Sequence, residues 1–212
     1  RFSSIEISPL SKTAIPEGGD WVVMPQKVKM APVCYYDTEG FHTISPDYTK
    51  TNEAPYIGVR TTEAVDVKKQ DVHIEFRIDE FAYEGNDPQN RYDEWFCIAV
   101  WPNDEMVPGS TDYGSGWLCL LRGKGNGKTQ VQPYWTEGRD SEGRSGKFGA
   151  CTAFTDAYAD IDINGKEHYT FDMKWNGSSC EISVCGMNVN TDYMDSLLHD
   201  GSVYIYIFGQ TR

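Results

Sequence analysis

The chain has 212 residues, of which 39% are hydrophobic and 13% aromatic, so it can bury a core and is a poor candidate for intrinsic disorder. Its formal net charge is −13, and the sequence contains no cluster of Lys and Arg. This charge argues against nucleic acid and anionic membranes as partners, because both are bound by clustered cations. Neutral or cationic partners stay open. No apolar run approaches the roughly 20 residues of a membrane helix, so no membrane insertion is expected.

Strand patterns recur along the chain, and helical patterns are almost absent. The clearest is at 72–79, where an apolar set that begins with Val72 alternates with a polar set that begins with His73. In chain order, strands are predicted at 4–8, 20–24, 32–36, 56–60, 72–79, 95–101, 116–123, 129–135, 160–163, 168–175, 180–189 and 202–208. Only 191–199 offers a helical turn or two, with Thr191 as its predicted N-cap.

Two of these segments predict which faces are buried. Both alternating sets of 95–101 are apolar, which predicts a strand covered on both sides. The segment 168–189 reads as a hairpin about Asn176-Gly177. Its packed face is predicted to carry Tyr169, Phe171, Met173 and Trp175, and its outward face Thr170, Asp172 and Lys174.

Many short strands with loops of moderate length predict an all-β protein, a two-sheet antiparallel jelly-roll sandwich. We see no linker or repeat, so residues 1–212 are expected to form one domain. The sequence begins at Arg1 without an initiator methionine, which is typical of a segment of a longer protein.

The hairpin "HYTFDMKWNGSSCEISVCGMNV", followed by "GSVYIYIFG", resembles the C-terminal part of the concanavalin A-like lectin/glucanase superfamily. The strand "VHIEFRID" is similar to an early strand of that group, and the resemblance covers about residues 55–209. It implies a concanavalin A-like sandwich with a concave sheet, and the group includes legume lectins, laminin-G-like domains and several glycoside hydrolase families. A shared fold does not decide among these functions.

A glycoside hydrolase needs two carboxylates on either side of the scissile bond. The Glu-x-Asp-x-x-Glu strand that one large family of this fold carries has no counterpart here. If the chain is an enzyme, Glu75 is the first acid to test. The alternative is that Glu75 forms an ordinary pair with Arg77 on the same face of its strand.

A sugar-binding surface needs aromatic rings for stacking and polar side chains for the hydroxyls. The polar face of 72–79 offers His73, Glu75 and Arg77, and one face of 129–135 offers Gln130, Gln132 and Tyr134. If the two strands lie side by side, these six side chains form one polar trough; the alternative is a solvated sheet face. Tyr113, in a Gly- and Ser-rich loop, is the predicted loop contact.

Calcium is a possible cofactor at Asp160, Asp162 and Asn164, because "DIDING" copies the first half of a calcium loop. The bidentate Glu expected at the twelfth position is replaced by Phe171, and a strand that runs into a turn explains the same letters. The oxygen-rich segment Glu84–Glu94 is a second candidate.

The six cysteines show no metal-ligand spacing, and if a disulfide forms, Cys97–Cys119 is the expected pair.

The first hypothesis from the sequence is a non-catalytic carbohydrate-binding module that recognises a neutral poly- or oligosaccharide on a concave sheet face. Such a module would be extracellular, either secreted or at the cell surface. Its expected partner is glycan, and other domains of the same chain are further candidates. The alternatives are a glycoside hydrolase that uses Glu75 and an adhesion or structural domain that binds protein.

Overall fold

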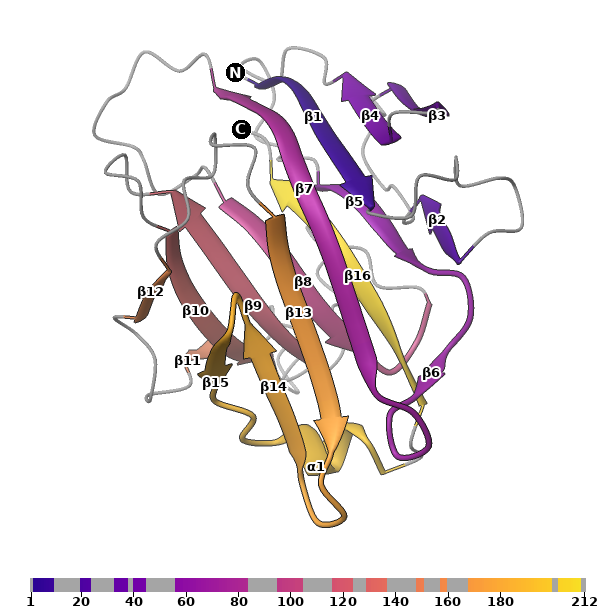
Figure 1. Ribbon diagram of the computed structural model, residues 1–212, viewed down its shortest axis with the longest axis vertical. Coiled ribbons are helices and arrows are strands. Elements are labelled where there is room, and N and C mark those ends of the chain that lie inside the picture. The colour runs from indigo at the N-terminus through magenta and orange to yellow at the C-terminus, as the bar shows by residue number, and fades with distance from the viewer. Residues whose placement is uncertain are drawn as a thin grey trace, which may run out of the picture.

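The structure is a computed structural model, and it describes residues 2–9, 20–23, 33–37, 40–44, 56–83, 95–104, 116–123, 129–136, 148–150, 157–159, 168–199 and 202–210. Antiparallel strands form two sheets (Figure 1). Sheet A runs in the order β15 (Met187–Val189), β14 (Cys180–Val184), β13 (His168–Trp175), β7 (Val72–Tyr83), β1 (Phe2–Pro9), β4 (Gly40–Ile44) and β3 (Val33–Asp37). The predicted two-sheet antiparallel sandwich is therefore confirmed.

Sheet B lies behind sheet A in Figure 1. Its main order is β11 (Phe148–Ala150), β10 (Thr129–Thr136), β9 (Gly116–Gly123), β8 (Trp95–Trp101), β16 (Ser202–Gln210), β5 (Tyr56–Thr61) and β2 (Trp21–Val23). Two short strands, β12 (Ala157–Ala159) and β6 (Val65–Asp66), pair with β10 and β16. The prediction of 1–212 as a single domain stays a prediction.

The core lies between the sheets and is built by alternation along each strand. Sheet A contributes Val72 and Phe76 from β7 and the packed face of β13, and the rings of Phe76 and Tyr169 stack with their centroids 5.3 Å apart. Sheet B contributes one residue in two from its central strands, namely Val59, Ile98, Val100, Trp117, Cys119, Leu121, Val131, Trp135, Val203, Ile205 and Ile207. The predicted packed and outward faces of β13 are confirmed, with Trp175 half-buried at the rim.

Strand β8 is covered on both faces, as predicted. Ile98 and Val100 lie in the core between the sheets, whereas Cys97, Ala99 and Trp101 belong to a second buried cluster on the other face of sheet B. We call that other face the outer face of sheet B.

Strands β13 and β14 are joined by Asn176–Ser179, whose geometry is fixed by the Asn176 side chain. Its Oδ1 accepts hydrogen bonds from the backbone N–H groups of Ser178 and Ser179, at 3.0 and 2.9 Å, and its Nδ2 donates to Glu181 at 2.8 Å. Gly177 adopts φ 99°, a value that glycine tolerates without strain. The predicted turn at Asn176-Gly177 is therefore present as a four-residue loop.

The predicted helical segment is present as the single turn α1 (Met194–Leu197), but the predicted N-cap is wrong. Tyr193 occupies the N-cap position, without a side-chain hydrogen bond to the helix, and Thr191 only accepts the Met194 N–H through its backbone oxygen at 3.0 Å. The side chain of Asn190 instead holds the preceding turn, because its Oδ1 accepts from the Asp192 N–H at 2.7 Å. No helix in the described part of the chain is long and apolar enough to cross a membrane.

The Cys97–Cys119 pair, expected if a disulfide formed, is not present, and both cysteines are reduced and buried. The reason is register: Cys119 pairs with Ile98, so it points into the core between the sheets while Cys97 points to the outer face. Cys180 and Cys185 are also free. Burial raises the pKa of Cys180 to about 12 and that of Cys185 to about 11, so neither thiol is an activated nucleophile at neutral pH.

Candidate functional site

The polar trough predicted from β7 and β10 does not exist, because the two strands lie in different sheets. Strand β7 pairs with β1 and β13 in sheet A, and β10 pairs with β9 in sheet B. His73 and Glu75 therefore face away from Gln132 across the whole sandwich. Arg77 lies in β7 with them, and its side chain is outside the described part of the structure. The six predicted residues separate into two sets of three.

The first set belongs to the outer face of sheet A, where His73 bridges two carboxylates. His73 Nδ1 lies 2.6 Å from Asp172 Oδ1, and His73 Nε2 lies 3.5 Å from Glu75 Oε1. The hydroxyl of Ser183 donates to the second oxygen of Asp172 at 3.4 Å. Because Asp172 and not His73 contacts the serine, this is no nucleophile–base arrangement. The alternative pair of Glu75 with Arg77 stays a prediction, because the Arg77 side chain lies outside the described residues.

The hydrogen bond from Asp172 raises the pKa of His73 above its ordinary value of 6.5, and Glu75 adds to the effect. The folded protein therefore holds this proton more tightly than the unfolded chain does. The resulting stabilisation is complete below the unfolded pKa of about 6.5 and is lost as pH rises through the folded value. Its size is small, since the His73 side chain is 58% exposed.

We expect an NMR titration of His73 to give a midpoint above 6.5 and the Asp172→Asn variant to move that midpoint downward. In urea unfolding between pH 5.5 and 8.5, the wild type should lose more stability with rising pH than His73→Gln, which cannot titrate. A midpoint at or below 6.5 in the wild type would contradict the contact with Asp172.

The second set, Gln130, Gln132 and Tyr134, lies together on the outer face of sheet B, as predicted for one face of this strand. The phenol of Tyr134 donates to Gln132 Oε1 at 3.2 Å, and both side chains are half-buried. The register aligns Tyr134 with Leu118, Ala99, Tyr206 and Arg60 in one row across five strands. The centre of this face is a buried cluster, made of Cys97, Ala99, Trp101, Leu118, Leu120, Tyr206 and Phe208.

Small residues allow the large rings of this cluster to pack flat on the sheet. Gly116 lies under the indole of Trp101, and a Cβ atom at this position would overlap the ring. Gly58 lies beside Phe208 in the register, and a Cβ atom there would overlap the backbone of β16. Glycine at these two positions is therefore a packing requirement.

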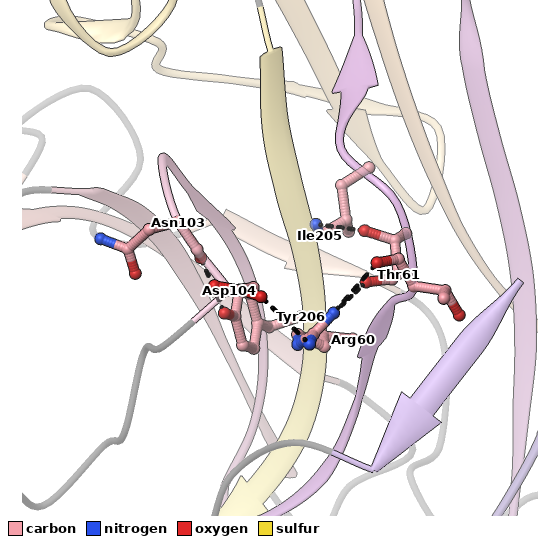
Figure 2. A network of polar contacts seen from close by, with 7 residues as sticks. Arg60, Thr61, Asn103, Asp104, Ile205 and Tyr206 are labelled. Atoms are coloured by element: carbon pink, nitrogen blue, oxygen red, sulfur yellow. Dashed lines mark hydrogen bonds and ion pairs between the residues drawn. The ribbon is translucent and has the colours of Figure 1, made fainter.

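At the other flank of the cluster, Arg60 organises a polar network (Figure 2). Its Nη1 donates to the backbone oxygens of Thr61 and Thr62 at 2.8 and 3.2 Å, and its Nη2 lies 3.5 Å from Asp104 Oδ2. The guanidinium carbon lies 5.4 Å from the centre of the Tyr204 ring. Arg60 is only 15% exposed, whereas Asp104 is half exposed, so this network links the buried cluster to the surface.

Tyr206 joins the same network from the cluster. Its hydroxyl donates to the backbone oxygen of Asn103 at 2.8 Å, which fixes the loop that carries Asp104 (Figure 2). Among the described residues, no acceptor is present for two buried donors of this region, Arg60 Nε and Trp101 Nε1. A buried donor without an acceptor costs about 1–3 kcal/mol.

The sequence reasoning missed Arg60, Trp101 and Tyr204 as members of a polar site. A signal was present in β16, where Tyr204, Tyr206 and Phe208 alternate with Val203, Ile205 and Ile207. This alternation predicts that one face of β16 is aromatic. It does not reveal that Arg60 of β5 lies beside the aromatic residues of that face.

Several predicted positions lie outside the described residues: Tyr113, the calcium candidates Asp160, Asp162 and Asn164, and the segment Glu84–Glu94. The calcium proposal therefore stays a prediction. Among the residues that the structure does describe, no group of three or more His, Cys, Asp or Glu side chains is placed to hold a metal ion.

No family model matches the chain, and no curated protein matches its sequence. Several solved structures align with it, among them two at 11% identity. One is the laminarinase catalytic domain from Thermotoga maritima, with a TM-score of 0.38 over 93% of this chain and 69% of that chain. The other is the Bacillus licheniformis β-glucanase, with a TM-score of 0.39 over 98% of this chain and 86% of that chain. At these TM-scores the two alignments do not assign a function to the chain.

Proposed function

We propose that the chain is a non-catalytic carbohydrate-binding domain whose ligand contacts the outer face of sheet B. The observation that carries the proposal is that aromatic and polar side chains lie on both sides of the buried cluster of this face. Tyr134 and Gln132 are half-buried at one flank, and Tyr204 and Arg60 are half-buried at the other. Aromatic rings beside amide and guanidinium donors are the groups that bind the apolar faces and hydroxyls of sugars.

Binding without cleavage is favoured by the kind of polar group on this face. The seven strands in the main order of sheet B carry Arg60 and Arg122 and no Asp or Glu. Asp104, a carboxylate at the Arg60 flank, is in an ion pair with Arg60. Hydrolysis of a glycosidic bond needs a pair of carboxylates on either side of it, one of which acts as an acid.

The net charge of −13 favours neutral glycans over acidic ones. An extracellular or cell-surface location, and a place within a longer protein, are parts of the same proposal.

The hydrolase alternative has a partner for Glu75 that could not be named from the sequence. Asp172 lies on the neighbouring strand, and both carboxylates contact the imidazole of His73. If these two acids were catalytic, the wild type would release reducing ends from a polysaccharide, and Glu75→Gln would not. We expect no release from either protein.

Native gel electrophoresis in soluble polysaccharide tests the binding proposal. The gels should contain, one at a time, laminarin, mixed-linkage β-glucan, xyloglucan, galactomannan, alginate and pectin. We expect a neutral glycan to retard the wild type. Tyr134→Ala or Tyr204→Ala should weaken the retardation about 5- to 150-fold, which corresponds to the loss of about 1–3 kcal/mol of stacking.

The matched control is Lys174→Ala, an exposed change on the outer face of sheet A, which should leave retardation unchanged. Thermal unfolding of each variant separates lost binding from lost folding. A blank panel with the wild type, or full retardation of the Tyr134→Ala/Tyr204→Ala double variant, would contradict the proposal.

A further inference from the structure

Tyr193 is the one large hydrophobic residue that is exposed in the described part of the chain. The residue is 58% exposed, although Trp135, which its ring contacts, is buried. One face of its ring stacks on Trp135, with the centroids 5.4 Å apart and the planes 22° apart. The opposite face is therefore the part of the ring that is open to solvent.

The backbone of Tyr193 is held in a conformation that a bulky residue rarely adopts, with φ 73° and ψ −6°. Two of the other positions with positive φ, Gly177 and Gly186, carry glycine, for which such angles are free of steric cost. Glycine or asparagine would suit position 193 better than tyrosine does. A strained bulky residue at an exposed position points to a use for its side chain.

The segment that carries the Tyr193 ring is anchored to the core on both sides. The Trp117 indole donates to the backbone oxygen of Asn190 at 3.0 Å, which fixes the start of the segment to the core. After Tyr193, Met194 and Leu198 are buried in the core between the sheets. Because the segment is anchored on both sides, a ligand that stacks on the ring pays little conformational entropy to order it.

Two acidic residues that are close to Tyr193 in the chain narrow the class of ligand. Asp192 precedes Tyr193, Asp195 follows two residues after it, and both are exposed; Asp192 Oδ2 accepts a hydrogen bond from Asn190 Nδ2 at 3.2 Å. Carboxylates accept hydrogen bonds from sugar hydroxyls and repel uronates and sulfated sugars. The surroundings therefore suit a neutral pyranose.

We propose that Tyr193 is a second stacking contact for a neutral glycan, at the end of the sandwich where α1 lies (Figure 1). It is distinct from the outer face of sheet B, because Trp135, on which it stacks, belongs to the core between the sheets, whereas the preceding residue Tyr134 faces outward. This inference rests on the proposed function, of which it names a further contact and the ligand class.

The experiment compares Tyr193→Asn, Tyr193→Phe, Tyr134→Ala and Tyr204→Ala in the gel that contains the polysaccharide that retards the wild type. Asparagine tolerates the left-handed backbone and removes the ring, whereas phenylalanine keeps the ring. We expect Tyr193→Asn to weaken retardation about 5- to 150-fold and Tyr193→Phe to weaken it by less than about threefold. The thermal unfolding midpoint of Tyr193→Asn should equal or exceed that of the wild type, since the backbone strain is relieved.

The outcomes separate a failure of the Tyr193 contact from a failure of the site on the outer face of sheet B. If Tyr193→Asn binds like the wild type, Tyr193 only covers Trp135 and this inference is overturned, while the outer face of sheet B stays in place. If Tyr193→Asn loses binding and Tyr134→Ala and Tyr204→Ala do not, Tyr193 is confirmed and the sheet B site fails. If no polysaccharide retards the wild type, or only alginate and pectin do, both proposals for a neutral glycan fail.

Discussion

Gly58→Ala is expected to destabilise the protein by about 3 kcal/mol or more, at the upper end of the cost of overpacking. A Cβ atom at position 58 would overlap the carbonyl oxygen of Ile207 and the Cα of Phe208 on the neighbouring strand. Backbone atoms within a hydrogen-bonded sheet cannot move aside as a side chain can. Strands β5 and β16 would have to separate, and they carry Arg60 and Tyr204 of the candidate site.

The measurement is urea unfolding, and Gly116→Ala is the matched control. The added methyl group at position 116 meets the ring of Trp101 and not a backbone, so part of the cost is relieved by a shift of the indole. We expect a smaller loss of stability for Gly116→Ala and an altered tryptophan fluorescence spectrum. If the free energy of unfolding of Gly58→Ala lies within about 0.5 kcal/mol of that of the wild type, β5 does not pack against β16 in this way.

Phe171→Ala is expected to cost about 3–5 kcal/mol, the range for deletion of a large buried aromatic side chain. Phe171 is fully buried between the sheets, with its ring centre 6.4 Å from that of Trp117 on sheet B. The substitution therefore removes a contact between the two layers and leaves a cavity.

The control for this prediction is on the same strand. Lys174 is exposed on the outer face of sheet A, and Lys174→Ala should change the free energy of unfolding by less than about 0.5 kcal/mol. Equal effects of the two substitutions would mean that the faces of β13 are not assigned as described.

The local features of the fold could be predicted from the sequence, because they depend on alternation within single strands. The faces of β13 and the double burial of β8 follow from which residues occupy odd and even positions. Short strands with weaker patterns, such as β4, β6 and β11, gave no usable signal. Strand β12 lies just before the predicted strand at 160–163, which is outside the described residues.

The pairing of strands could not be predicted, and the error about the trough arose there. Strands β7 and β8 are consecutive among the longer strands, yet they belong to different sheets. Whether β7 and β10 share a sheet depends on contacts between residues far apart in the chain, which periodicity does not encode. Gln130, Gln132 and Tyr134 were correctly placed on one face of β10, but the residues across from them, Tyr206 and Arg60, come from other strands.

Tyr193 illustrates a second limit of sequence reasoning. Thr191 matches the usual preference for an N-cap, and the observed cap is Tyr193. The side chain of Asn190, and not that of Thr191, holds the backbone before the helix, because its Oδ1 accepts the Asp192 N–H. The helix therefore begins later than the sequence predicts. The sequence alone does not tell which of two neighbouring polar side chains bonds to the backbone.

The most direct test of the central claim is a crystal structure of the chain with an oligosaccharide derived from the polysaccharide that retards it. We expect sugar rings against the outer face of sheet B, in contact with Tyr134 or with Tyr204 and Arg60. A sugar bound instead beside His73, Glu75 and Asp172 on sheet A would contradict the proposed binding face and favour the hydrolase alternative.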